Sequence, residues 1–145
     1  MVSLYRGFHE VLPPGEQLNI FRNVPRTPTH SDLDVHRHAD SWFLKRFGVS
    51  ARSTTIICST DLSQARSYGA TYRIIPSEPL LCIYSPGVRD FLEHEIDLSS
   101  TSRADVWAWL DSKQYGAVDS VGAISEDFFG EVMVCCAKFV ALLSK

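Results

Sequence analysis

The sequence predicts a single α+β domain that spans residues 1–145. Short β-branched and apolar runs are mixed with segments that carry helix caps, and the steady strand–helix alternation of a doubly wound sheet is absent. The chain has 145 residues, 45% of them hydrophobic and 21% charged, which is the range of ordinary globular proteins. A chain of this length buries roughly two-thirds of its unfolded surface. No repeat, low-complexity tract or linker divides it.

The charge balance gives no general reason to expect a nucleic acid or a membrane as partner. The formal net charge is -3, so bulk electrostatics do not favour either polyanionic surface. Basic residues nevertheless gather in the first third of the chain. This group leaves room for a local anion-binding site, and it comprises Arg22, Arg26, Arg37, Lys45, Arg46 and Arg52.

The cysteines and the N-terminus favour a cytoplasmic protein. Cys58, Cys82, Cys135 and Cys136 lack the paired spacing of a zinc site. We expect them to be reduced and mostly buried, and Cys135 and Cys136 to point to opposite faces of a strand without bonding each other. No apolar run is long enough for a signal peptide or a membrane span, so a soluble, intracellular chain is expected.

The first thirty residues predict two extended segments and a loop. Residues 2–8 alternate weakly and form the first expected strand, and residues 18–22, LNIFR, form a second extended run. Pro25 and Pro28 then interrupt regular structure, so residues 23–30 are expected to form an irregular loop.

The strongest helix signal covers residues 31–48. Ser31 is the expected N-cap, two aspartates stand in the first turn, two basic residues stand in the last turn, and Gly48 follows. Apolar residues repeat at helical spacing and define one core-facing side. These residues are Val35, Ala39, Trp42 and Phe43.

Residues 52–69 predict a strand, a polar turn and a short helix. Residues 54–58, TTIIC, form a β-branched and apolar run of strand length. Ser59, Thr60 and Asp61 follow, and spacing alone favours capping of a helix over a ligand site. The helix is expected to stop at Gly69. Hydroxyl groups delivered by the end of a strand also suit a polar site on a rigid frame.

The remaining chain predicts four strands, two helices and a loop. The first helix is expected to begin after Ser85 with proline at its first position, and the second to be capped by Ser102. The expected strands are residues 71–75, 80–84, 131–134 and 139–143, the helices run from Pro86 towards His94 and onward from Ser102, and the loop covers residues 114–122.

Residues 30–40, HSDLDVHRHAD, place histidine and aspartate at alternating positions. On a strand they would line one face, but the helix signals here are stronger. On a helix only pairs such as His36 and Asp40 share a face. A solvated polar face is therefore favoured over a metal site, and no metal ligand is assigned. Nucleophile-elbow, P-loop and GxGxxG motifs are absent.

Three segments of the chain carry, in order, an arginine, a serine–threonine turn and a glutamate. An arginine in an early extended segment occurs twice, in LYRG at Arg6 and in IFRNVPR at Arg22. The stretch IICSTDLSQARSYG carries Ser59 and Thr60 between a strand and a helix, with a cysteine before them. The stretch GEVMV places Glu131 at the start of a late strand. Together these pieces resemble the ADP-ribosyltransferases of the arginine–serine–glutamate type.

The resemblance implies an ADP-ribosyltransferase-like fold and NAD as the cofactor consumed. Arg6 or Arg22 would hold the dinucleotide phosphates, for which a guanidinium fork is suited. Ser59 and Thr60 would bind the nicotinamide ribose. Glu131 would be the catalytic carboxylate that stabilises an oxocarbenium-like state. The implied activity transfers ADP-ribose to a macromolecular target, with cleavage of the nicotinamide–ribose bond.

Two further observations bear on this assignment. The segments FRNVPRTP, HRHADSWFLKRFGVSARS and YSPGVRDF are similar to small uncharacterised proteins of bacteriophages, which suggests Arg22 over Arg6 as the functional arginine and a host protein as the target. Tyr68 and Tyr72 either stack on the nicotinamide or fill the core, and the core is favoured for both because aromatic residues usually pack there. Tyr68 is nevertheless kept as a candidate cofactor-binding residue.

Two alternative functions stay open. The first is a non-enzymatic protein that engages a host protein. Phe129 favours it, because arginine-modifying members of the family carry Glu or Gln two residues before the glutamate. The loop with Arg22 and Arg26, expected to be exposed, favours it as well. The second alternative is a metal-dependent hydrolase built on His36, His38 and Asp40.

Overall fold

The α+β class is confirmed by the computed structural model, which describes residues 1–29 and 31–144. Within these residues eight strands form one antiparallel sheet in the order β2-β8-β4-β1-β3-β7-β5-β6. The strands are β1 (Leu4–Phe8), β2 (Glu16–Leu18), β3 (Ile56–Ser59), β4 (Ala70–Pro76), β5 (Leu81–Tyr84), β6 (Gly116–Val118), β7 (Glu131–Cys135) and β8 (Lys138–Leu143).

The helices are short apart from two. They are α1 (Leu33–Phe47), α2 (Ala51–Thr54), α3 (Leu62–Arg66), α4 (His94–Asp97) and α5 (Arg103–Ser112), with the 3-10 helices η1 (Ile20–Arg22), η2 (Phe91–Glu93) and η3 (Val121–Ala123). Within the described ranges, no helix is long and apolar enough to cross a membrane.

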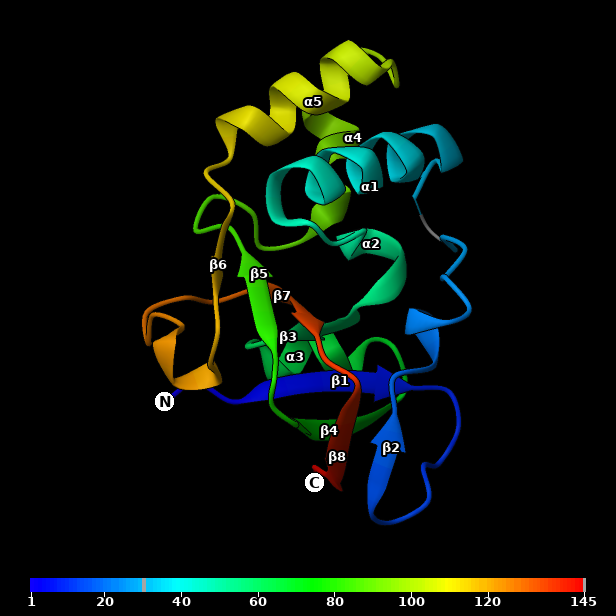
Figure 1. The fold of residues 1–145 in the computed structure, drawn as a ribbon, viewed down its shortest axis with the longest axis vertical. Coiled ribbons are helices and arrows are strands. Elements are labelled where there is room, and N and C mark those ends of the chain that lie inside the picture. Colours follow the sequence, from blue (N-terminus) through cyan, green and yellow to red (C-terminus); the bar gives the residue numbers. More distant parts are fainter. Residues whose placement is uncertain (30, 145) are drawn as a thin grey trace.

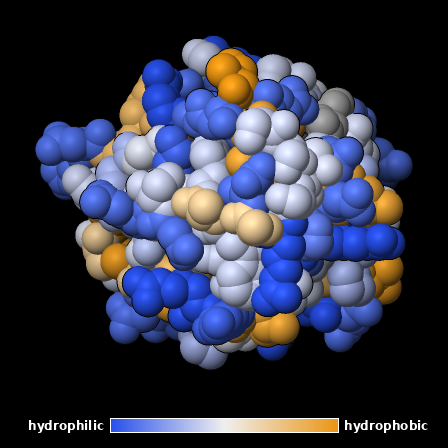
Figure 2. Space-filling view, turned by 90° about the horizontal axis from the view of Figure 1, so that it is seen from above, coloured by the Kyte–Doolittle hydropathy of each residue, from blue (hydrophilic) through white to orange (hydrophobic). Residues whose placement is uncertain are grey.

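Figure 1 shows α1, α4 and α5 together at one end of the molecule, while β1 and β4 run crosswise to β5 and β7 at the other. Two apolar clusters fill the interior. One joins α1 and α5 to β5 and β7, and the other lies among the strands around β1, β4 and β8. The surface at the helical end is mostly hydrophilic with separate hydrophobic side chains (Figure 2).

Helix α1 matches its sequence signals closely. Its predicted apolar residues are buried, and Gly48 ends the helix with a left-handed φ of 76°. The N-cap is Asp32 instead of Ser31, because the Asp32 carboxylate accepts hydrogen bonds from the backbone N–H groups of Asp34 and Val35. Trp42 donates from its indole to Asp111 of α5 at 2.9 Å, which ties the two long helices together.

The expected extended run over residues 18–22 is wrong in its second half. Strand β2 ends at Leu18, and residues 20–22 form the 3-10 helix η1. The cause is Asn19, whose side chain accepts from the N–H of Phe21 and donates to the carbonyls of Thr54 and Cys136. A buried asparagine that caps a turn and pins two distant segments outweighs the local preference for an extended chain.

The strand expected over residues 54–58 begins too early. Residues 51–54 form the short helix α2, and β3 covers residues 56–59. The hydroxyl of Thr54 donates to the carbonyl of Ser50, and that of Thr55 to the carbonyl of Ala51. Such back-bonds give threonine a place in a helical turn despite its preference for strands. The predicted helix follows as α3, capped by Asp61.

The helix expected from Pro86 is also wrong. The Ser85 hydroxyl accepts from the N–H of Gly87 and donates to the carbonyl of Lys113, which closes a tight turn instead. Helical structure starts only after Asp90, whose capping box opens η2 and leads into α4. The loop expected at residues 114–122 contains β6 and the start of η3. The other predicted strands and the helix capped by Ser102 are confirmed.

Candidate functional site

A cavity of about 450 Å³ opens where β1, β3 and β7 meet the loop after η1. Arg6 of β1, Ser59 at the end of β3 and Glu131 at the start of β7 all line it. The remaining wall includes residues of α1, α2, α3, η1 and η2 and the segment that carries Arg26. Residues far apart in the sequence therefore surround one concave space, which is the usual form of a small-molecule site.

Strand register explains why Ser59 and Glu131 come together next to β1. Ser59 pairs with Tyr5 of β1 on one side and with Glu131 of β7 on the other. Directly opposed residues in antiparallel strands have Cα atoms about 4.5–5.5 Å apart. The positions of Tyr5, Ser59 and Glu131 thus form one row across three neighbouring strands, and Arg6 follows next along β1.

Arg6 is a deeply placed guanidinium. Its Nη1 donates to the carbonyl of Ile57 at 2.7 Å, and its Nε is buried without a hydrogen-bond partner in the described part of the chain. Burial lowers the pKa of Arg6 below its ordinary value. An unpaired donor on a buried cation is unfavourable, so the site suits an acceptor with negative charge.

Arg26 lies beside Arg6 and is held in place by the backbone. Its guanidinium donates to the carbonyls of Arg52 at 2.9 Å and Thr55 at 2.8 Å, and its carbon centre lies 3.9 Å from the centroid of the Phe21 ring. Burial, and then repulsion by Arg6 and Arg52, lowers the pKa of Arg26 to about 9. The loop between Pro25 and Pro28 therefore presents a fixed, poorly compensated positive charge.

Glu131 forms an ion pair with Arg52. Arg52 Nη1 and Glu131 Oε1 are 2.6 Å apart, and the two side chains are only 10% and 14% exposed. The backbone N–H groups of Arg52 and Ser53 donate to one carboxylate oxygen of Asp40, which fixes α2 against α1. The carboxylate of Glu131 is thus positioned by an arginine whose own backbone is anchored.

Ser59 and Thr60 have different surroundings. The Ser59 hydroxyl lines the cavity, donates to Oε1 of Gln64 and accepts from the N–H of Asp61. Thr60 is not part of the cavity wall. Its hydroxyl accepts from the N–H of Gly130 at 2.9 Å and donates to the carbonyl of Phe128 at 3.1 Å. It therefore fixes the turn that leads into Glu131.

Gly130 is required at this turn for steric reasons. Its φ is 154°, and a Cβ atom would lie 2.7 Å from Cα of Arg89. Gly7 has a similar role next to Arg6, because a Cβ there would lie 2.9 Å from the backbone of Tyr68 and would also meet the carbonyl of Ala65. The close packing of α3 on β1 depends on that missing side chain.

Charge around the cavity is unevenly distributed. Among the described residues, Arg6, Arg26 and Arg52 line it together with two acidic residues, Glu131 and Asp90. The Glu131 carboxylate pairs with Arg52, and the Asp90 carboxylate accepts hydrogen bonds from the N–H of Leu92 and the side chain of Gln64. No ion pair between a carboxylate and Arg6 or Arg26 occurs within the described ranges. Two neighbouring guanidinium groups are therefore available to a ligand that carries negative charge.

The structure brings together Arg6, Ser59, Tyr68 and Glu131 of the predicted site residues. Arg22 lies elsewhere: it ends η1, is exposed, and does not line the cavity. Tyr72 is buried, and its hydroxyl accepts from the N–H of Leu12. The core placement of Tyr68 is wrong, because its side chain is 39% exposed at the cavity wall.

The sequence did not predict three cavity residues, Arg26, Arg52 and Gln64, as part of the ligand site. Arg52 stood out only as a member of a basic group, and Arg26 as a member of that group and of a loop expected to be exposed; the two prolines around Arg26 mark the restricted segment that carries it. Gln64 gave no signal, because a glutamine inside a short helix is ordinary. Only the three-dimensional structure reveals its place at the cavity, where Gln64 accepts from the Ser59 hydroxyl and donates to the carbonyl of Arg89.

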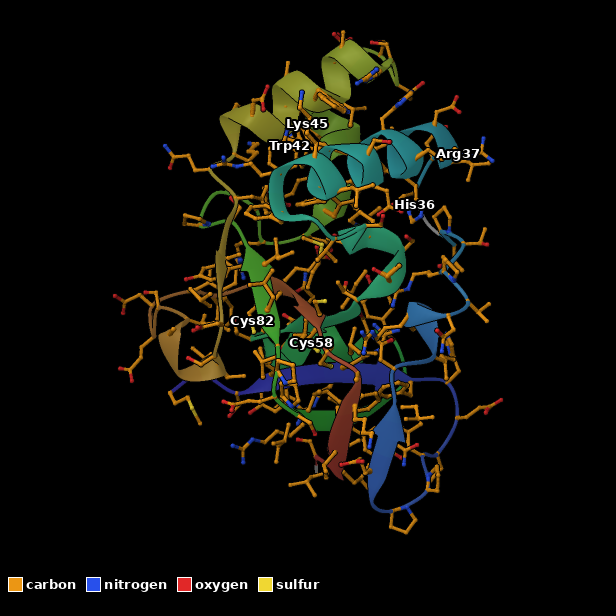
Figure 3. All side chains as sticks on the ribbon, viewed as in Figure 1. His36, Arg37, Trp42, Lys45, Cys58 and Cys82 are labelled. Atoms are coloured by element: carbon orange, nitrogen blue, oxygen red, sulfur yellow. The ribbon has the colours of Figure 1, made fainter. Side chains whose placement is uncertain are left out.

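His36 and Asp40, which the sequence places on one face of a helix, lie next to each other in α1. His36 Nε2 and Asp40 Oδ2 are 3.9 Å apart, and His36 lines the cavity. Burial lowers the pKa of His36, against the opposing effect of Asp40. Figure 3 shows Arg37 pointing away from α1, whereas His36 lies on the inner side.

The metal alternative has no geometric support in the described ranges. They contain no group of three or more His, Cys, Asp or Glu side chains able to hold a metal ion. His36 lines the cavity but His38 does not. His30, the first member of the predicted cluster, lies outside the described residues. The four cysteines are free thiols, and all but Cys135 are buried.

Comparison with protein families, curated proteins and solved structures finds no significant match to this chain. Its function is therefore argued from the cavity.

Proposed function

We propose that this protein binds NAD in the cavity, cleaves its nicotinamide–ribose bond and transfers ADP-ribose to a macromolecular acceptor. One observation carries the proposal. Arg6, Ser59 and Glu131, taken from three distant parts of the sequence, line the same cavity on three adjacent strands. These are the residue types, in the same chain order, that the resemblance to ADP-ribosyltransferases implies.

The cavity fits a dinucleotide by charge. NAD carries two phosphate groups, and Arg6 and Arg26 provide two neighbouring guanidinium groups that lack carboxylate partners within the described ranges. A guanidinium binds phosphate oxygens bidentately, and burial strengthens such a contact. The choice between the two early arginines therefore falls on Arg6, because Arg22 is exposed and outside the cavity.

Ser59 and Glu131 supply the polar groups for the ribose end. Breaking the bond to nicotinamide places positive charge on the ribose, as in glycoside cleavage. Glu131, at the start of β7, presents a carboxylate that stabilises this charge. Ser59 stands opposite it in the sheet and offers its hydroxyl oxygen. Thr60 acts through the backbone, by holding the turn before Glu131 in place.

Tyr68 completes the proposed pocket. It stands at the cavity wall and is 39% exposed, so its ring can take part in stacking on a flat heterocycle. Gly7 allows this arrangement because it lets the backbone of Tyr68 approach β1 closely. The nicotinamide ring is the flat group that we assign to this wall.

The test combines calorimetric titration of NAD with an assay for released nicotinamide, on the wild type and on Glu131→Gln. The glutamine keeps the shape of the side chain but removes its charge. We expect both proteins to bind NAD, and release to fall at least about 100-fold in Glu131→Gln, the usual cost of losing such a charge-stabilising group. Absence of binding by both proteins would exclude NAD as the ligand.

A second candidate function is recognition of a host protein without catalysis. The observation that favours it is Phe129, which is 52% exposed and lies two residues before Glu131. The Arg89 guanidinium packs 4.9 Å from the centroid of its ring and lies 3.6 Å from Asp61. Exposed aromatic and arginine side chains are typical of protein interfaces. Capture of one defined partner that Phe129→Ala abolishes and Glu131→Ala leaves unchanged would select this function.

A further inference from the structure

Arg52 is more firmly held than any other cation at the cavity. Its guanidinium contacts Glu131 Oε1 at 2.6 Å and the sulfur of Met133 at 3.4 Å, and its carbon centre lies 4.0 Å from the centroid of the Phe91 ring. Its backbone N–H donates to Asp40. Only 8% of Arg52 is exposed.

The contacts of Arg52 differ in kind from those of Arg6 and Arg26. Those two arginines donate to backbone carbonyls and have no carboxylate partner in the described part of the chain. The charge of Arg52 is instead compensated by Glu131. An arginine already bonded to a carboxylate is poorly suited to hold a phosphate, because the carboxylate would repel the incoming anion.

Arg52 also determines which part of the Glu131 carboxylate remains available. Oε1 is bonded to Arg52, whereas no hydrogen bond to Oε2 occurs in the described ranges. A short charge-assisted hydrogen bond fixes the plane of a carboxylate. The second oxygen is then the one free to meet a ligand in the cavity.

We infer that Arg52 is the positioning residue for Glu131: it fixes one carboxylate oxygen so that the other faces the ribose of the bound substrate. This inference rests on the proposed function. The carbonyl of Arg52 also accepts a hydrogen bond from Arg26, so one residue aligns the carboxylate and an arginine proposed to hold phosphate. Asp40 and α2 anchor this arrangement to the helical end.

The experiment measures kcat and KM for nicotinamide release, and the Kd for NAD, in Arg52→Ala and Arg52→Lys. Arg37→Ala, on the exposed side of α1, is the matched control. We expect Arg52→Ala to lower kcat by about 100-fold while KM and Kd change less than about threefold, because only the catalytic carboxylate is misplaced. Arg52→Lys should recover part of kcat, since it keeps the charge but not the geometry.

Two further measurements separate positioning from general structural damage. Guanidinium ion added to Arg52→Ala should restore part of the lost kcat, and Arg37→Ala should not respond. In the Glu131→Gln background, Arg52→Ala should cause little further loss, because residues that act as one unit are not additive. If Arg52→Ala does not fold, as judged by near-ultraviolet circular dichroism, Arg52→Gln takes its place in each comparison.

Three results would overturn the inference. The first is a kcat within twofold of wild type in Arg52→Ala. The second is a fall in NAD affinity as large as the fall in kcat, which would make Arg52 a ligand-binding residue. The third is a loss of kcat in the Arg52→Ala, Glu131→Gln double variant that equals the product of the losses in the two single variants. An inactive wild type would instead refute the proposed function itself, so the two failures are distinguishable.

Discussion

Inorganic diphosphate is expected to stabilise the folded protein through Arg6 and Arg26. Both guanidinium groups lie at the cavity without carboxylate partners in the described ranges, and the pKa of Arg26 falls to about 9 through burial and repulsion by Arg6 and Arg52. Keeping these charges together costs folding free energy, which a bound polyanion offsets. At a ligand concentration of 100 times Kd the gain is about 2.7 kcal/mol. For a chain of this size that corresponds to roughly 8 °C in Tm.

The assay is thermal unfolding of the wild type with sodium diphosphate, against sodium chloride of equal ionic strength. Arg6→Met and Arg26→Met should each lose most of the shift in Tm. Arg22→Met is the matched control, because Arg22 is exposed and outside the cavity. Equal shifts with chloride, or loss of the shift in Arg22→Met alone, would refute the assignment of the anion to these two arginines.

Three further perturbations test other parts of the structure. Gly7→Val should abolish NAD binding and lower Tm, because its side chain would meet the Ala65 carbonyl and displace α3; unchanged calorimetric affinity would contradict this. Phe43→Ala should lower the free energy of unfolding by about 3–5 kcal/mol in urea titration, since Phe43 is completely buried. Burial lowers the pKa of His36 below 6.5, so the unfolded chain takes up a proton first as pH falls. Stability should therefore drop below about pH 6.5, and it should drop less in His36→Gln; identical pH profiles of urea unfolding would count against a buried neutral histidine.

Local sequence signals predicted much of the secondary structure. They failed where contacts with residues distant in the sequence determine the backbone conformation. The capping and dipole signals of α1 are contained within its own sequence, and the helix ends at Gly48 as expected. Asn19, by contrast, turns the chain at η1 because it bonds to Thr54 and Cys136. Ser85 blocks the predicted helix through its bond to Lys113. None of these three partners can be recognised from the residues next to Asn19 or Ser85 in the sequence.

The candidate site was predicted in part for the same reason. Ser59 and Glu131 stand out as a hydroxyl at a strand end and an acid at a strand start, and their pairing follows once β3 and β7 are neighbours. The ion pair of Glu131 with Arg52 joins residues 79 positions apart. The sequence favoured Arg22, but Arg6 is the arginine that lines the cavity. Arg6 lies there because β1 is the neighbour of β3, and this strand order depends on the whole sheet.

The most direct test of the account is a crystal structure of Glu131→Gln with NAD. We expect the diphosphate between Arg6 and Arg26, the nicotinamide ribose next to Ser59 and residue 131, and the nicotinamide ring at Tyr68. A dinucleotide bound elsewhere on the surface, or bound in the cavity with its phosphates away from both arginines, would contradict it.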